Sequence, residues 1–188
     1  MRRLVMETSR LILRPLRSND YKMWFEAYVL SLPAKNKWDR NPMKAIRCSR
    51  AEFDKVRACH ALRAKDDKCY VYGVFTKAQP QLVGMIDISL YDRKTMKYAN
   101  FGYQMFNRHW GHGYGQEAAR AAVHIGLKQL KLQRLEASID LDNKRSLRLV
   151  KAIGMHYEGV KKFYWCEKGK WQDQKIFIAN PQDFKFRS

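Results

Sequence analysis

Three glycines at alternate positions, Gly111, Gly113 and Gly115, lie where a strand-like run gives way to a helix-like one. Because glycine has no Cβ, such a loop can turn its N–H groups inward and let an anion approach the main chain closely. The helix that follows adds free N–H groups and the positive end of its dipole, which suits a pyrophosphate. The spacing is neither the dinucleotide fingerprint nor a P-loop. The glycines alone therefore leave a phosphate cradle and an ordinary glycine-rich turn equally open.

Histidines and cysteines are the other side chains that could carry chemistry. His109 and His112 share the glycine loop, but no third type of ligand clusters near them in the sequence, so we predict no metal site. The four cysteines, at positions 48, 59, 69 and 166, have neither CxxC spacing nor the density of a disulfide framework. This pattern favours reduced thiols in the cytosol.

Composition predicts one compact domain over residues 1–188 and an unusually basic surface. The chain has 37 Lys and Arg residues against 18 Asp and Glu, a formal net charge of +19. This excess favours a polyanionic partner such as nucleic acid, the ribosome, an acidic protein or a phosphate-rich cofactor, with a generally basic surface as the alternative. The sequence has no apolar run of the signal-peptide or membrane-spanning kind, so we expect a soluble, cytoplasmic protein without membrane contact.

Turn residues and hydrophobic periodicity divide the chain into the elements that must position the glycine loop. Ser49 and Glu52 have capping-box spacing at the start of one helix, Asn143 suits the N-cap of another, and Gly154 suits the position after that helix. In chain order we predict a strand over 8–17, helices over 21–30 and 49–65, strands over 69–75, 82–90 and 96–106, a central helix over 114–130, a strand over 132–141, a helix over 144–153, and strands over 155–165 and 171–179. This order is typical of a mixed α/β architecture with a central sheet flanked by helices.

Four patches of sequence follow one another along this order. They are residues 7–16 (ETSRLILRPL) with Asp20, residues 110–118 (WGHGYGQEA), residues 143–146 (NKRS), and residues 154–155 with 158–159 (GM and EG). Together they resemble the GCN5-related N-acetyltransferase (GNAT) superfamily, and within it the branch that acetylates the N-terminal alanine or serine of ribosomal proteins. The resemblance implies the GNAT fold, in which a mostly antiparallel seven-stranded sheet is splayed in its middle and flanked by about four helices.

The resemblance also implies acetyl-CoA as the co-substrate, with no metal. The patch at 110–118 is similar to the family's acetyl-CoA loop, R/Q-x-x-G-x-G/A, with Trp110 at its first position. Family chemistry is direct attack of an amine on the thioester, without a covalent enzyme intermediate. The implied cofactor-binding residues are Met105, Phe106, Trp110, Gly111, His112, Gly113, Tyr114, Gly115, Gln116 and Asn143.

Ser146 matches the position that donates a proton to the departing thiolate in this branch. A hydroxyl in the first turn of a helix suits that role, because the helix dipole also stabilises a developing anion. The alternative is that Ser146 is simply a polar residue of the first turn. A tyrosine one helical turn further along does this work in many GNAT enzymes, but Val150 and its neighbours are aliphatic here.

The general base is where this sequence departs from its relatives. Asn100 and Trp165 stand at the two positions where relatives carry glutamate, and the nearest carboxylates by strand position are Asp87, Asp140 and Glu167. An N-terminal amine has a reference pKa of about 8 and is already partly neutral at neutral pH. We therefore predict deprotonation through water, with no base assigned.

The charge and the resemblance together favour the N-terminal amine of a ribosomal or other protein as the acceptor, with rRNA phosphate holding the enzyme. A cationic enzyme is expected to repel free polyamines, which argues against them as acceptors. The alternatives are a small-molecule amine acceptor, or a GNAT-fold module that binds the ribosome or RNA and has lost catalysis. Homodimers are common in this branch, but the sequence does not show an interface.

Overall fold

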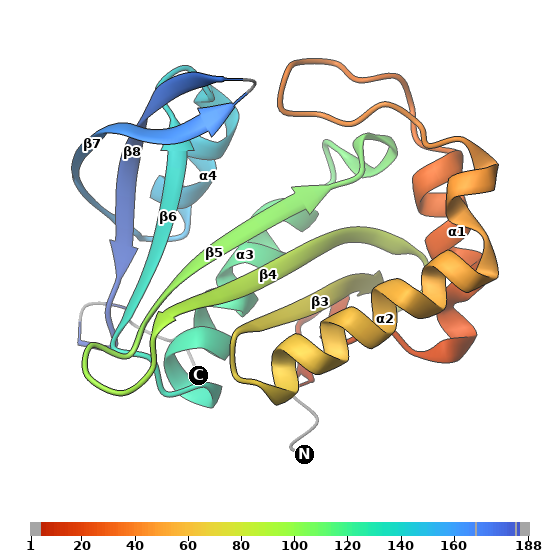
Figure 1. The fold of residues 1–188 in the computed structure, drawn as a ribbon, viewed down its shortest axis with the longest axis horizontal. Helices are drawn as coiled ribbons and strands as arrows, with labels where there is room; N and C mark the ends of the chain where they lie inside the picture. Colours follow the sequence, from red (N-terminus) through yellow and green to blue (C-terminus); the bar gives the residue numbers. More distant parts are fainter. Residues whose placement is uncertain (1–4, 168, 183, 185–188) are drawn as a thin grey trace.

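The computed structural model describes residues 5–167, 169–182 and 184, and its centre is one mixed sheet with the strand order β1-β2-β3-β4-β5-β6-β8-β7 (Figure 1). The strands are β1 (Met6–Glu7), β2 (Leu11–Arg14), β3 (Cys69–Thr76), β4 (Leu82–Asp92), β5 (Tyr98–Met105), β6 (Arg134–Asp140), β7 (His156–Glu167) and β8 (Lys170–Ala179). The helices are α1 (Tyr21–Val29), α2 (Arg50–Lys65), α3 (Tyr114–His124) and α4 (Lys144–Ala152). The predicted α/β architecture is confirmed.

The sheet is antiparallel except between β5 and β6, where it also opens. These two strands pair in parallel over only three residues of each, Tyr98–Asn100 with Arg134–Glu136, and then diverge. Figure 1 shows the resulting wedge between the two strands. The predicted splay is confirmed, and it leaves backbone groups of both strands without a strand partner beyond Asn100.

The sheet has eight strands, where the resemblance implied seven. The additional strand is β1, which pairs with β2 through Met6 opposite Leu13 and Glu7 opposite Ile12. The chain reverses between them at Thr8, whose hydroxyl accepts a hydrogen bond from the Leu11 amide at 2.9 Å. Pairing of two such short segments depends on the rest of the sheet beside them, so the local pattern gave no sign of it.

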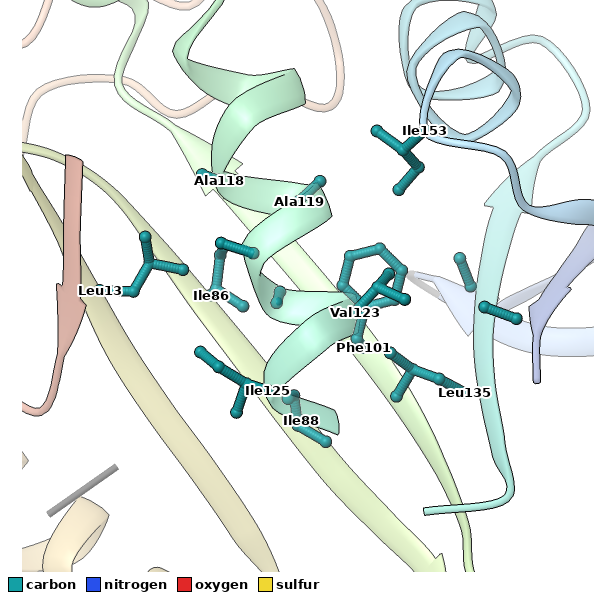
Figure 2. Close-up of a cluster of buried hydrophobic side chains, with 14 of the residues drawn as sticks. Leu13, Ile86, Ile88, Phe101, Ala118, Ala119, Val123, Ile125, Leu135 and Ile153 are labelled. Carbon is teal, nitrogen blue, oxygen red and sulfur yellow. The ribbon is translucent and has the colours of Figure 1, made fainter. Parts of the chain in front are cut away.

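The central helix lies close to the sheet because its inner face carries alanines. Ala118, Ala119 and Ala122 have no exposed surface and pack against residues such as Ile86 and Phe101 (Figure 2). The α-helix ends at His124, and the rest of the predicted 114–130 helix continues as a π-helical turn over Ile125–Gln129. On the opposite face of the sheet, α1 and α2 enclose a second core around Trp24, Phe53 and Phe106.

The helix caps follow the sequence cues. Ser49 accepts a hydrogen bond from the Glu52 amide, Asn143 accepts one from the Ser146 amide at 3.1 Å, and Gly154 takes a left-handed conformation with φ of +90° after α4. The caps matter for function because Asn143 sets the start of α4 beside the wedge. No helix within the described residues is both long and apolar enough to cross a membrane.

Candidate active site

The glycine loop between β5 and α3 forms one wall of a hollow of about 280 Å³, which we call the cradle. Gly111 and Gly113 have φ of +90° and +77°, a left-handed region that other L-residues occupy only with strain. A Cβ added at Gly111 would meet nothing within 4 Å, so it would project into open space. The cradle is lined by Met105, His109, Trp110, Gly111, Gly113, Tyr114, Gly115, Gln116, Arg145, Arg148, Leu149 and Ala152.

The Glu117 carboxylate anchors this loop to the turn between β1 and β2. Its Oε1 accepts hydrogen bonds from the Thr8 hydroxyl at 2.5 Å and from the Arg10 amide at 3.0 Å, and its Oε2 accepts one from Arg10 Nε at 2.7 Å. Arg10 also donates to the carbonyl of His112 at 2.9 Å. Burial raises the pKa of Glu117, but the hydrogen bonds from Thr8 and Arg10 outweigh it and hold that pKa below its usual range. The carboxylate therefore stays ionised and fixes the loop.

Two arginines of α4, Arg145 and Arg148, bring positive charge to the cradle. The Arg145 guanidinium lies 3.6 Å from the centroid of the Trp110 ring, and the Trp110 indole donates to the Met105 carbonyl at 2.8 Å. Trp110 is thus held between a strand carbonyl and a cation. Our sequence analysis missed both arginines, although a pair three residues apart at the start of a helix that caps the site was a usable signal.

The second hollow, which we call the cleft, lies in the wedge between β5 and β6 and has a volume of about 550 Å³. Asn143 and Ser146 line it from the first turn of α4, and Asn100 and Tyr103 line it from β5. The full lining is Trp38, Tyr91, Asn100, Phe101, Gly102, Tyr103, Ala137, Ser138, Ile139, Asp140, Asn143, Ser146, Tyr164, Trp165, Glu167 and Gln174. Among these described residues there are two carboxylates and neither lysine nor arginine, in a chain whose net charge is +19.

Tyr103 is the residue of the cleft that our sequence analysis overlooked. Its hydroxyl is buried and, among the described residues, has no hydrogen-bond partner. Burial raises the pKa of Tyr103, while the nearby Ser146 hydroxyl and the charge of Arg145 lower it by less. The Ser146 side chain is thus close enough to affect the phenol without meeting the geometry of a hydrogen bond. The phenol stays protonated at neutral pH beside Ser146.

The positions expected to carry a base hold none. Asn100 donates to the Ser138 hydroxyl at 3.2 Å, and Ser138 donates to Glu136 at 3.2 Å. Glu136 has no exposed surface and also accepts from Lys161 at 2.7 Å and from Tyr98 at 2.6 Å. Burial raises the pKa of Glu136, but the hydrogen bonds from Lys161 and Tyr98 outweigh this effect and hold that pKa below its usual range. This carboxylate is therefore a poor proton acceptor.

Of the three substitute carboxylates, Asp140 and Glu167 line the cleft and Asp87 is not among its lining residues. Burial raises the pKa of Asp87, which lies opposite Gly102 on the neighbouring strand and accepts from Ser89. Asp140 accepts from the Trp38 indole at 2.5 Å. It is already engaged in holding the rim of the cleft.

The segment 31–44 crosses the mouth of the cleft. The Trp38 indole donates to Asp140, the last residue of β6, and Lys37 lies 2.9 Å from the carboxylate of Asp142, between β6 and α4. The segment thus contacts the β6 side of the wedge (Figure 1). The base of the segment is tied to the glycine loop by Asn107, which is buried, accepts from the Leu32 amide at 2.9 Å and donates to the Leu32 carbonyl at 2.8 Å. Asn107 therefore links the segment to the turn that leads into the glycine loop.

Two residues that we predicted to bind the cofactor, Phe106 and His112, are not among the residues that line the cradle or the cleft. The Phe106 side chain packs against Tyr28 in the second core, with ring centroids 5.0 Å apart, and His112 is exposed and stacks on Tyr114. His109 lines the cradle instead, and burial followed by the charge of Arg108 lowers the pKa of that histidine. Within the described part of the chain, no group of three or more His, Cys, Asp or Glu side chains could hold a metal ion.

Comparisons with known proteins agree with this geometry. The family model for the acetyltransferase (GNAT) domain matches residues 10–156. The chain is 32% identical to the Probable N-acetyltransferase YjcK of Bacillus subtilis over 122 residues, which is 64% of this chain and 67% of that protein. It is 25% identical over 120 residues to the [Ribosomal protein uS5]-alanine N-acetyltransferase of Escherichia coli, covering 64% and 62% of the two chains. A solved structure from Vibrio cholerae, assigned as a ribosomal-protein-serine acetyltransferase, superposes with a TM-score of 0.75 at 25% identity, covering 95% of this chain and 98% of that one.

Proposed function

The chain belongs to the GNAT acetyltransferase family, and from that premise we propose that it transfers the acetyl group of acetyl-CoA to a primary amine, the N-terminal amine of a ribosomal or other protein. The observation that carries the proposal is the meeting of cradle and cleft at the first turn of α4. Asn143 and Ser146 line the cleft from this turn, and Arg145 lines the cradle from the same turn. A cofactor held by its phosphates in the cradle can thus extend its thioester into the cleft.

The cradle fits the pyrophosphate of acetyl-CoA. The amides of the glycine loop and of the first turn of α3 supply donors, and Arg145 and Arg148 supply charge. Gly111 leaves the main chain open to an anion, since a Cβ added there would meet nothing within 4 Å. The pantetheine arm then runs along the wedge, where β5 and β6 have lost each other as partners, and Asn143 contacts it from α4.

The leaving thiolate needs a proton, and Ser146 together with Tyr103 provides it. The amine nitrogen attacks the thioester carbonyl, the carbon–sulfur bond breaks, and the sulfur takes the proton. A phenol has a reference pKa of about 10 and a thiol about 8.5, and burial raises the pKa of Tyr103 further, so the phenol gives up its proton only as negative charge develops on the sulfur. An aliphatic hydroxyl is a much weaker acid, so Ser146 acts best by passing on the proton of the phenol. The attacking amine loses its own proton to water, and water returns a proton to the Tyr103 phenolate.

The cleft itself attracts amines even though the protein as a whole is cationic. Asp140 and Glu167 line it, and the described lining contains no lysine or arginine. The expectation that net charge repels cationic acceptors stays a prediction, and the two carboxylates weaken that repulsion at the site because charges beyond about 10 Å are screened. The aromatic rings of Trp38 and Tyr164 already face ammonium groups of this chain, those of Lys37 and Lys161, each 4.6 Å from the ring centroid.

The same carboxylates favour one second candidate, a small-molecule amine acceptor. The names of relatives argue for a protein acceptor: uS5 alanine in the Escherichia coli enzyme and a ribosomal-protein serine in the Vibrio cholerae one. The basic surface supports the protein acceptor further, because ribosomal RNA would attract it. A degenerate binding module is the weaker alternative, since Ser146 and the glycine loop are both in place.

The first test is calorimetric titration with acetyl-CoA, using Gly113→Trp to block the cradle and Gly169→Trp as its matched control. Both glycines have φ of +77°, but Gly169 lies in the β7–β8 turn with nothing within 4 Å of an added Cβ. We expect micromolar binding by the wild type and the control, and none by Gly113→Trp. Equal binding by the two variants would show that acetyl-CoA does not bind in the cradle.

The second test distinguishes the acceptors by thiol release. The panel contains ribosomal-protein N-terminal peptides, the same peptides with blocked N-termini, and spermidine. We expect turnover with free N-termini only. Turnover with spermidine alone would establish the second candidate, and acetyl-CoA binding without turnover on any amine would favour the degenerate module.

A further inference from the structure

A third hollow of about 680 Å³ lies at the sheet edge formed by the first half of β3, away from the cradle and the cleft. β2 pairs with β3 only from Gly73 to Thr76, and the chain then turns away at Pro15. The residues Cys69–Tyr72 therefore have no strand beside them on that edge. The α2 helix closes one side of the gap, and the end of the π-helical turn closes the other. We call this hollow the edge pocket.

The edge pocket gathers unpartnered polar atoms. Four buried side-chain polar atoms within the described residues have no hydrogen-bond partner, and three of them belong to its lining: Arg57 Nε, the Tyr72 hydroxyl and Gln129 Oε1. Tyr72 is 1% exposed. Buried polar groups in folded proteins are almost always hydrogen-bonded, so three unsatisfied ones around a single hollow indicate that a ligand or ordered water binds there. Together they offer two donors and two acceptors, since a hydroxyl can serve as either.

The charged side chains that line the edge pocket favour an anionic ligand. Arg57, Arg93 and Lys131 line the pocket, and none of its described lining residues is Asp or Glu. Arg93 is held by Asp67 at 2.5 Å and Arg57 Nη1 by Asp54 at 3.0 Å, which leaves Arg57 Nε and the exposed Lys131 for a ligand. Burial, and then the charge of neighbouring Arg63, lowers the pKa of His60 in the same wall, so that histidine is neutral at neutral pH.

The rest of the wall is apolar and aromatic, with the rings of Tyr70 and Tyr72 and the side chains of Leu16 and Leu130. A volume of this size is within the range of small-molecule sites. We propose that the edge pocket is a second ligand site, which binds a small organic anion: an apolar or aromatic body with one carboxylate or phosphate group. The acidic group meets Arg57 and Lys131, the body lies along the tyrosines, and a polar substituent meets Tyr72 and Gln129.

The test uses the fluorescent probe 8-anilinonaphthalene-1-sulfonate, an aromatic anion, on protein saturated with CoA so that the cradle is occupied. We expect saturable binding with one probe per chain. Ala64→Trp fills the pocket and should abolish it. Lys131→Met should weaken binding and reduce its dependence on salt. No saturable binding, or binding unchanged in Ala64→Trp, would overturn the proposal, and retained CoA binding by that variant confirms that it is folded.

A matched pair of variants makes the assignment specific. Tyr72→Phe and Tyr103→Phe each remove one buried hydroxyl without a partner, but only Tyr72 lines the edge pocket. We expect Tyr72→Phe to lower the affinity for the probe roughly 2- to 10-fold, which corresponds to the loss of one hydrogen bond. Tyr103→Phe should leave that affinity unchanged. Equal effects of the two variants would contradict the site.

Competition identifies which part of the ligand matters. Benzoate and phenyl phosphate should both displace the probe, and the stronger competitor shows whether a carboxylate or a phosphate is the better acidic group. Inorganic phosphate, which has no apolar body, should not displace it at the same concentration. Displacement by inorganic phosphate as effective as by phenyl phosphate would overturn the proposed class of ligand.

Discussion

Removal of the Glu117 carboxylate should weaken acetyl-CoA binding although Glu117 does not line the cradle. The side chain accepts four hydrogen bonds from the β1–β2 turn, two from Arg10, one from Thr8 and one from Ser9. A hydrogen bond to a charged group contributes about 1.5–3 kcal/mol. The Arg10 side chain is half exposed, so its ion pair contributes no more than about 1 kcal/mol. We expect Glu117→Ala to lower the free energy of unfolding by about 2 kcal/mol, allowing for partial rescue by water.

The effect on binding follows from the loop that the anchor holds. Without the anchor, only part of the population keeps the conformation that binds, and the apparent Kd rises in inverse proportion to that fraction. Since 1.4 kcal/mol corresponds to a factor of ten, the anchor limits the loss of affinity to about 30-fold. Glu117→Gln keeps one oxygen for Thr8 and the Arg10 amide and loses only the exposed ion pair. It should cost about 1 kcal/mol or less, and under about 5-fold in affinity.

Urea unfolding and calorimetric titration with acetyl-CoA measure the two effects on the same samples. Glu52→Ala is the matched control, because Glu52 pairs with Lys55 on the exposed face of α2, far from the loop. The reasoning is refuted if Glu117→Ala loses stability but binds acetyl-CoA as the wild type does. It is also refuted if Glu117→Gln loses as much as Glu117→Ala, since the ion pair would then be the whole anchor.

Three further predictions concern the proton donor, the cradle charge and pH. Ser146→Ala and Tyr103→Phe should each lower kcat by roughly 100-fold with little change in the KM for acetyl-CoA, because each removes a group needed only when the thiolate leaves. Thiol release measures both. Arg145→Met should raise the Kd for acetyl-CoA about 10-fold and flatten its salt dependence, because a charge facing phosphate is lost; titration at low and high salt checks this. Below pH about 6.5 the free energy of unfolding should fall, because burial lowers the pKa of His60 in the folded chain and the unfolded chain then binds more protons. His60→Gln should reduce that fall in urea titrations between pH 7.5 and 5.5.

Each of these has an outcome that would count against it. If Ser146 and Tyr103 form one relay, the double variant should be no slower than the more damaged single variant, and multiplying losses would separate their roles. Lys151→Met, an exposed lysine of α4 outside the cradle lining, should bind acetyl-CoA as the wild type does. The difference in stability between His60→Gln and the wild type must not vary with pH near pH 8, where the native histidine is neutral in both states.

Local signals in the sequence determined most of the elements and the place of the cradle. Ser49 and Asn143 cap their helices as their types predict, and the alanines of α3 pack on the sheet. Gly111 and Gly113 need glycine because of their own backbone angles. These properties depend on neighbours a few residues away, so spacing and residue type are sufficient to predict them.

Tertiary structure alone decided the partners that make the site work. Glu117 meets Arg10 across 107 positions of the chain, and Tyr103 comes to lie beside Ser146 only because β5 ends next to α4. The same holds for the acidic lining of the cleft, which the overall composition of the chain concealed. Sheet pairing brings together side chains that are distant in sequence, and interactions between exposed charges are screened beyond about 10 Å. The chemistry of the cleft was therefore readable only after the strands had been placed beside one another.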